Sequence, residues 1–229
     1  DVDELSGACG DADMVFVCNP NNPTGTLFPP DTLTDLINRH TGTLFVVDES
    51  YLPFVGDAES LSLVMGDSPD NLVVLSSMSK IFRIPGLRTG FLSGSRAAVS
   101  CVLKYYQPWS VNSLAQEVVK AVFDSPDFII PFYLETRDYI TREKQVFIDR
   151  IAPLQDIELF DSSTYFVLAR LTGRLNSNAF CDLIGRRRLL IRDCANFEGL
   201  SDRYVRFSLK EQAVNMMLAD AVEEVIGND

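Results

Sequence analysis

Three short apolar runs, each followed at once by polar residues, constrain the fold of this chain more than any other feature. The runs are Met14–Cys18, Leu44–Val47 and Leu72–Leu75, and continuous apolar runs of this length are typical of strands buried on both faces. Between the first two, Pro29–Asp31 opens a segment with helical spacing of its apolar residues. Strands that alternate with helices predict parallel β-α units in an open α/β sheet.

The alternation of buried strands with helices ends at about Ser95. Before it, Arg88–Leu92 is predicted to be a fourth strand, and beyond it shorter strands mix with helices. The predicted helices are Ser113–Phe123, Asp127–Ile151, Asn176–Gly185 and Glu211–Ile226, and the predicted strands are Tyr165–Ala169, Leu189–Arg192 and Tyr204–Leu209. We expect the domain boundary in or near the long helix, with a first domain over 1–124 and a smaller α+β domain with the interdomain helix over 125–229.

Charge and hydropathy exclude several classes of partner. The formal net charge of -12 argues against nucleic acid and anionic membranes, which both reward basic surfaces. An anionic small molecule stays possible, because a few converging Arg and Lys side chains suffice to bind it. No apolar run approaches the length of about 20 residues that spans a bilayer. The N-terminus is acidic where a signal peptide would be basic, so we expect a cytoplasmic protein.

Cysteine and histidine usage gives no sign of a metal centre. The five cysteines are odd in number and lack any CxxC spacing, which favours reduced thiols over a zinc ribbon or a redox pair. The single histidine, His40, lies in a polar helix end and is predicted to be a surface residue. We therefore expect neither a Ser-His-Asp triad nor a metal site.

The polar segments that follow the three apolar runs are the candidate site. They are Asn19–Gly25, Asp48–Tyr51 and Ser76–Lys80, and ligands of open α/β sheets bind at the carboxyl ends of the strands. Each segment alone has an ordinary structural interpretation, either as a turn or as a helix cap. Their coincidence at one predicted edge of the sheet favours a ligand site.

The segment after the third run has the residues of a phosphate site. Ser77 and Ser79 supply hydroxyl groups and Arg88 a guanidinium group, and both donor types match phosphate oxygens. Lys80 lies between them in the sequence. As a Schiff-base former rather than a phosphate ligand, its amine has a clear chemical use.

In combination these segments resemble the fold type I pyridoxal-phosphate (PLP) enzymes, the aspartate aminotransferase superfamily. The resemblance rests on Asn-Pro-Thr-Gly at 22–25, Asp-x-x-Tyr at 48–51, and Ser-x-Ser-Lys at 77–80 with an Arg eight residues later. It implies PLP as cofactor and part of the mainly parallel sheet of the family's large domain, followed by the small C-terminal α+β domain. The implied roles are hydrogen bonds to the cofactor's 3′-oxygen from Asn22 and Tyr51, pairing of Asp48 with the pyridinium nitrogen, phosphate binding by Ser77, Ser79 and Arg88, and the Schiff base on Lys80.

Two arginines near the C-terminus are candidates for substrate binding. Arg192 and Arg206 lie fourteen residues apart, flank a short loop, and the second is in a predicted strand, which favours anion binding over two solvated charges. By the same resemblance, Arg206 would bind the substrate α-carboxylate. Arg192 would bind a phosphate group on the substrate.

The segments Pro108–Gln116 and Ile191–Lys210 resemble the branch of the superfamily that acts on phosphorylated amino acids. They imply decarboxylation of L-threonine O-3-phosphate to (R)-1-amino-2-propanol phosphate, a step of cobalamin biosynthesis. The alternative is amino transfer from histidinol phosphate. Tyr51 departs from the Phe that such decarboxylases often carry, and this keeps amino transfer open.

The resemblance covers essentially the whole chain but only the later part of the family's fold. Members carry a long segment before the strand that matches Met14–Cys18, which supplies a phosphate loop, a ring-stacking residue and a Tyr that reaches across a homodimer. The start at Asp1 therefore predicts a fragment boundary. A further alternative is that the chain is an inactive C-terminal piece of such an enzyme.

Overall fold

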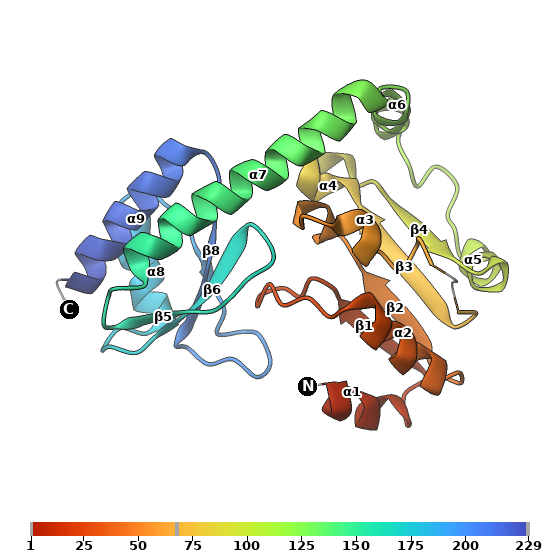
Figure 1. The fold of residues 1–229 in the computed structure, drawn as a ribbon, viewed down its shortest axis with the longest axis horizontal. Coiled ribbons are helices and arrows are strands. Elements are labelled where there is room, and N and C mark those ends of the chain that lie inside the picture. Colours follow the sequence, from red (N-terminus) through yellow and green to blue (C-terminus); the bar gives the residue numbers. More distant parts are fainter. Residues whose placement is uncertain (1, 67–68, 228–229) are drawn as a thin grey trace. The chain divides into compact units, whose positions relative to one another are not determined.

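The computed structural model describes residues 2–66 and 69–227, which form two compact units. The first unit takes in Asp1–Asn21 and Leu27–Leu134, and the second takes in Asn22–Thr26 and Glu135–Asp229. The long helix α7, Pro126–Ile151, contributes residues to both (Figure 1). Each unit has its own sheet.

The sheet of the first unit has four strands in the order β1-β2-β3-β4 (Figure 1). They are β1 (Met14–Cys18), β2 (Leu44–Asp48), β3 (Leu72–Ser77) and β4 (Gly90–Gly94). The first three are parallel to one another, as predicted. The sheet is therefore mainly parallel, as expected, and its fourth strand is antiparallel to β3. This strand begins later than predicted, because Arg88 has a left-handed backbone conformation with φ 53° that a strand cannot accommodate.

One face of this sheet is packed against helices α1 (Val2–Cys9) and α2 (Pro30–Arg39). Alternate strand residues point to this face, since side chains along a strand alternate between the two sides. The fully or almost fully buried members of the core are Cys9, Val17, Leu33, Leu36, Ile37, Phe45, Val47, Leu63, Leu72 and Val74. The intervening residues Val46 and Val73, on the other face, are also buried, so the apolar runs of β2 and β3 are continuous.

The remaining helical segments of the first unit are short, except α6. They are η1 (Leu52–Phe54), α3 (Ala58–Leu61), α4 (Met78–Ile81), η2 (Pro85–Leu87), α5 (Arg96–Leu103) and α6 (Ser113–Phe123). The end of α2 corrects one expectation: His40 is half-buried, and its Nε2 atom lies 3.0 Å from the Ser6 hydroxyl oxygen. It therefore fastens α1 to α2 instead of standing free at the surface.

The second unit has an antiparallel sheet in the order β5-β6-β8-β7, with helices packed against it. Its elements beyond α7 are β5 (Ile157–Leu159), β6 (Phe166–Leu171), α8 (Ser177–Gly185), β7 (Arg192–Asp193), β8 (Tyr204–Ser208) and α9 (Gln212–Gly227). The core centres on three buried aromatic rings, those of Phe147, Phe180 and Phe207. Strand β7 is shorter than the predicted Leu189–Arg192 and ends one residue later, because the pairing with β8 covers only Arg192 and Asp193.

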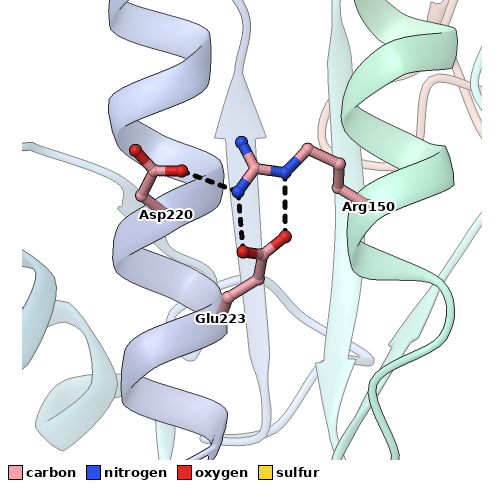
Figure 2. A network of polar contacts seen from close by, with 3 residues as sticks. All are labelled: Arg150, Asp220 and Glu223. Carbon is pink, nitrogen blue, oxygen red and sulfur yellow. Dashed lines mark hydrogen bonds and ion pairs between the residues drawn. The ribbon is translucent and has the colours of Figure 1, made fainter.

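Helices α7 and α9 of the second unit are joined by a bidentate ion pair (Figure 2). Arg150 donates from Nε to Glu223 Oε1 at 2.8 Å and from Nη2 to Glu223 Oε2 at 2.6 Å. The same Nη2 atom lies 2.6 Å from Asp220 Oδ1. Hydrogen bonds from both carboxylates, that of Glu223 first, raise the pKa of Arg150 above its usual range. This geometry matches the planar guanidinium fork to a carboxylate and fixes the pairing of the two helices.

The structure also bears on membrane insertion. Among residues 2–66 and 69–227, none of the helices combines the length and apolar character that a membrane span requires.

Candidate functional site

An open pocket of about 370 Å³ lies at the edge of the first unit's sheet where β2 and β3 end and β4 begins. Four of the residues singled out from the sequence line it, namely Asp48, Ser77, Ser79 and Arg88. The rest of the lining consists of Ser50, Leu75, Ser76, Thr89, Gly90, Phe91 and Leu92. The carboxyl ends of parallel neighbours thus bring together side chains from distant parts of the sequence, as expected for an α/β sheet.

The two hydroxyl donors of the candidate phosphate site come from one short turn at the start of α4, and the guanidinium donor, Arg88, follows η2. Ser77 is the N-cap of α4 and its Oγ accepts from the Ser79 backbone N–H at 3.2 Å. The two hydroxyl oxygens are 2.5 Å apart. Arg88 uses one N–H, from Nη1, to bind the Pro85 carbonyl oxygen at 2.9 Å, so the fork is held while its other donors remain available. Two hydroxyls and a guanidinium that line one pocket are the donor set that suits a phosphate dianion.

The candidate carboxylate is held by its own turn. Asp48 ends β2, and its Oδ1 atom accepts from the Ser50 backbone N–H at 2.9 Å. The backbone carbonyl of the same residue accepts from the Asn19 N–H at 2.9 Å. A carboxylate fixed in this way on a pocket wall can accept a hydrogen bond from a protonated ring nitrogen. The pocket therefore offers both groups that PLP requires, a partner for its ring nitrogen and donors for its phosphate.

Lys80 lies on α4, directly after Ser79 in the sequence, and neither Lys80 nor Tyr51 is among the residues that line the pocket. The side chain of Lys80 is exposed, and its Nζ atom is 5.8 Å from the centre of the Tyr51 ring. Tyr51 itself is 9% exposed. The amine is thus accessible to an aldehyde on the same side of the unit as the Tyr51 ring.

The other three candidates, Asn22, Arg192 and Arg206, belong to the second unit. Strands β7 and β8 pair Arg192 directly opposite Arg206, which explains their spacing of fourteen residues. Arg206 donates from Nη1 to Asn22 Oδ1 and lies over the Phe166 ring at 4.7 Å. Its Nε–H is buried and has no hydrogen-bond partner among the described residues. Arg192 donates to Asn196 Oδ1 at 2.7 Å and keeps most of its donors.

Electrostatics in this pair of strands argues against a cysteine nucleophile. Cys194 is fully buried next to Arg192. Burial raises the pKa of its thiol, while Arg206 and Arg192 oppose the change. A thiol whose pKa is raised stays protonated at neutral pH and is a poor nucleophile.

Sequence reasoning missed the contacts that hold Asn22–Thr26 in the second unit. A Cβ on Gly25, whose φ is +74°, would lie 2.0 Å from the Ser162 hydroxyl oxygen, so only glycine fits. The Ser163 N–H donates to the Gly25 carbonyl at 2.9 Å. Lys144 secures this turn from α7 by donating to the carbonyls of Ser162 and Thr164 at 2.5 and 3.1 Å. Burial lowers the pKa of Lys144, and the nearby Asp161 opposes this.

Asn19 has a structural role that its sequence motif concealed. Its side-chain oxygen accepts from the Phe28 N–H at 2.8 Å, and its Nδ2 donates to the Phe28 carbonyl at 3.1 Å. The side chain is 1% exposed. It thus closes the base of the 19–28 loop as a strand neighbour would. Within the part of the chain that the structure describes, no group of three or more His, Cys, Asp or Glu residues could hold a metal ion.

Comparison with known proteins extends these observations. The aminotransferase class I and II family matches residues 1–222. The histidinol-phosphate aminotransferase 2 of Bordetella bronchiseptica is 32% identical over 213 residues, which are 93% of this chain and 56% of that protein. The adenosylcobalamin biosynthesis bifunctional protein CobDQ of Leptospira interrogans is 28% identical over 215 residues, 93% of this chain and 24% of that protein.

A solved structure shows the same fold. The crystal structure of L-threonine-O-3-phosphate decarboxylase from Porphyromonas gingivalis superposes with a TM-score of 0.84 at 31% identity, over 94% of this chain and 65% of that one. The fold and the sequence together define the class: a fold type I PLP-dependent enzyme. The chain belongs to the aminotransferase class I and II family, whose cofactor is pyridoxal phosphate. It spans less than two thirds of the length of these relatives.

Proposed function

We propose that this chain binds PLP in the pocket at the ends of β2 and β3, with Lys80 as the residue that forms the Schiff base. The observation that carries the proposal is that Asp48, Ser77, Ser79 and Arg88 all line the same pocket. A carboxylate for the ring nitrogen and three donors for the phosphate fit the two charged ends of the cofactor. When bound, PLP would act as an electron sink for a bond at the substrate α-carbon.

The remaining cofactor contacts rest on the family resemblance. Asn22 and Tyr51 are proposed to hydrogen-bond the cofactor's 3′-oxygen. Asp48 would keep the proton on the ring nitrogen, because an adjacent carboxylate favours the charged form of the ring. Lys80, once released from the cofactor, would be the amine that moves a proton to or from the substrate α-carbon.

The proposed substrate is L-threonine O-3-phosphate, and the proposed reaction is its decarboxylation to (R)-1-amino-2-propanol phosphate in cobalamin biosynthesis. Arg206 would bind the α-carboxylate and Arg192 the substrate phosphate, since bidentate guanidinium groups suit both anions. The pairing of the two arginines across β7 and β8 supports a substrate with two anionic groups. The name of the Porphyromonas relative gives this decarboxylation, and the name of the Leptospira relative gives adenosylcobalamin biosynthesis; both support the proposal.

Amino transfer from histidinol phosphate is the second candidate. The identity of 32% to the Bordetella aminotransferase favours it, as does the hydroxyl of Tyr51. The two reactions would differ in which bond at the substrate α-carbon is broken. A small change in how Arg206 holds the carboxylate would therefore decide between loss of carbon dioxide and loss of a proton.

The organisation of the whole protein is part of the proposal. We assign 1–124 to the PLP-binding large domain and 125–229 to the interdomain helix and small domain. The complete enzyme would be a cytoplasmic homodimer acting on a phosphorylated amino acid. An inactive piece of such an enzyme is the alternative, which a binding experiment with this chain separates from the proposal.

The experiment is a PLP titration of the chain, followed by visible absorbance. We expect saturable binding that Arg88→Ala weakens by about 2 kcal/mol, the value of a lost charge-assisted contact, whereas Arg96→Ala, an exposed arginine of the same unit, leaves binding unchanged. Equal effects of both changes would refute the assignment of the phosphate site. For the reaction, the complete protein should release carbon dioxide from L-threonine O-3-phosphate without an oxo-acid acceptor. Amino transfer with no carbon dioxide would favour the second candidate.

A further inference from the structure

Glu49, which directly follows the candidate cofactor residue Asp48 in the sequence, has a buried carboxylate. Glu49 is 3% exposed and stands between Asp48 and the Ser50–Tyr51 turn in the sequence. Unlike Asp48, it does not line the pocket. Among the described residues no Lys, Arg or His pairs with it. Burying an unpaired carboxylate costs free energy, so its contacts should account for its presence.

Those contacts join the turn to a separate loop. Glu49 Oε2 accepts from the Ser62 hydroxyl at 2.7 Å, and Oε1 accepts from the Leu63 backbone N–H at 2.8 Å. Ser62 Oγ in turn accepts from the Val64 N–H at 3.2 Å. Leu63 is itself 6% exposed and belongs to the core of the first unit. Both carboxylate oxygens are therefore tied to a loop that the core already holds.

The backbone of Glu49 is fixed on the opposite side by the sheet. Its N–H donates to the Leu75 carbonyl at 2.8 Å, and its carbonyl accepts from the Leu52 N–H at 2.9 Å, at the start of η1. The residue is thus held by β3, by η1 and by the Ser62–Leu63 loop. On the pocket side, its neighbours Asp48 and Ser50 are joined to each other, since Asp48 Oδ1 accepts from the Ser50 N–H at 2.9 Å.

We infer that Glu49 is a positioning residue that fixes the Asp48–Tyr51 turn, and through it the carboxylate of Asp48 and the ring of Tyr51, in the geometry that PLP binding needs. The inference deepens the proposed function and rests on it for the cofactor. The fixing of the turn itself stands on contacts within the chain. Burial raises the pKa of Glu49, its hydrogen bonds to Ser62 and Leu63 oppose this, and the charge of Asp48 adds to the rise, as expected for a carboxylate held by hydrogen bonds in place of a cation.

Three substitutions separate positioning from the effect of charge. Glu49→Ala removes both hydrogen bonds. Glu49→Gln removes the charge but keeps an acceptor for the Leu63 N–H and offers an amide group to the Ser62 hydroxyl. Ser62→Ala removes one of the two hydrogen bonds of the Glu49 carboxylate, together with the bond that Ser62 Oγ accepts from the Val64 N–H, and keeps the charge. It serves as the second variant should Glu49→Ala fail to fold. Glu4→Ala, at an exposed glutamate of the same unit, is the control.

The first measurement is amide hydrogen exchange of Ser50 in the chain without PLP. We expect exchange about tenfold faster in Glu49→Ala, which loses both hydrogen bonds, and several-fold faster in Ser62→Ala, which loses one of them, since each lost hydrogen bond is worth several-fold in such an equilibrium. Exchange in Glu49→Gln and in the control should stay close to wild type. Unchanged Ser50 exchange in both Glu49→Ala and Ser62→Ala would overturn the inference. The inference would also be overturned if Ser50 exchange in Glu49→Gln were as fast as in Glu49→Ala while exchange in Ser62→Ala equalled wild type, because the charge of Glu49 alone would then be responsible.

The second measurement uses PLP added to the same variants. Glu49→Ala should weaken PLP binding about tenfold and shift the pH midpoint of the visible absorbance by about one unit, with rescue by Gln. Binding and midpoint equal to wild type in Glu49→Ala would overturn the inference while leaving the proposed function intact. Absence of PLP binding by the wild-type chain would instead count against the proposed function, and Ser50 exchange would still decide whether Glu49 fixes the turn.

Discussion

Replacing Gly25 by alanine tests how the Asn22–Thr26 loop is held in the second unit. A Cβ there would lie 2.0 Å from Ser162 Oγ, 2.6 Å from Ser162 Cβ and 3.1 Å from Ser162 Cα. Relief of such an overlap typically costs about 1–3 kcal/mol. The left-handed φ of +74° adds about 1–2 kcal/mol for any residue with a Cβ. We therefore expect Gly25→Ala to lower the free energy of unfolding by about 2–5 kcal/mol.

A matched glycine separates the two contributions. Gly199, also in the second unit, has φ +80°, and a Cβ placed on it meets no atom within 4 Å. Gly199→Ala should therefore cost only the conformational part, about 1–2 kcal/mol. In the Gly25→Ala background, Ser162→Gly removes the two closest atoms and should recover most of the difference in a double-mutant cycle.

The assay is urea unfolding at 25 °C, followed by far-UV circular dichroism. The cycle corrects for the hydrogen bonds that Ser162 makes by itself, including the one its Oγ accepts from the Thr164 N–H. Equal losses for Gly25→Ala and Gly199→Ala, or no recovery with Ser162→Gly, would refute the close approach as the reason for glycine at position 25.

Three further predictions concern ion pairs, pH and substrate. Arg150→Met should lower the free energy of unfolding by about 1–2 kcal/mol in low salt, because the bidentate ion pair of Arg150 with Glu223 is only partly exposed. The loss should be smaller in 1 M salt, and an equal loss at both salt concentrations would contradict an electrostatic origin. Because the pKa of Glu49 is raised above 4.5 by burial, the folded chain binds this proton more tightly than the unfolded chain, so stability from this group falls as pH rises above about 4.5. In urea titrations between pH 4 and 8, the free energy of unfolding of Glu49→Gln should therefore fall less with pH than that of wild type, and the variant should be more stable than wild type at pH 7. The same dependence on pH in both proteins would refute this. In the complete protein, Arg192→Ala should reduce kcat/KM for a phosphorylated substrate by about 2–5 kcal/mol and much less for its unphosphorylated analogue; equal losses would remove Arg192 from the phosphate site.

Much of the fold could be predicted because its strands are short, continuous apolar runs between turn residues. The positions of β1, β2 and β3 follow from these runs, and α9 follows from its helical spacing within one residue at each end. Strand direction carries no such local signal, so the antiparallel pairing of β4 with β3 does not follow from the residues of β4. Strand β5 escaped prediction because it has three residues, one of them the exposed Glu158.

The pocket was predictable for a different reason. Asp48 and Ser77 both follow buried parallel strands, so the topology alone brings them to one edge of the sheet. The contacts of Gly25 with Ser162 and of Glu49 with Leu63 depend on loops whose paths no local pattern encodes. Such contacts between distant segments form only when the whole unit has folded, and sequence periodicity does not report them.

The most direct test of the account is to identify the lysine that reacts with PLP. The chain is incubated with PLP, reduced with borohydride and digested, and the modified peptide is mapped by mass spectrometry. Lys80 should carry the label, and Lys80→Ala should remove both the label and the visible absorbance while the far-UV circular dichroism stays close to wild type, because this side chain is exposed. A label on Lys104 or Lys210 in place of Lys80, or undiminished labelling of Lys80→Ala, would contradict the central claim.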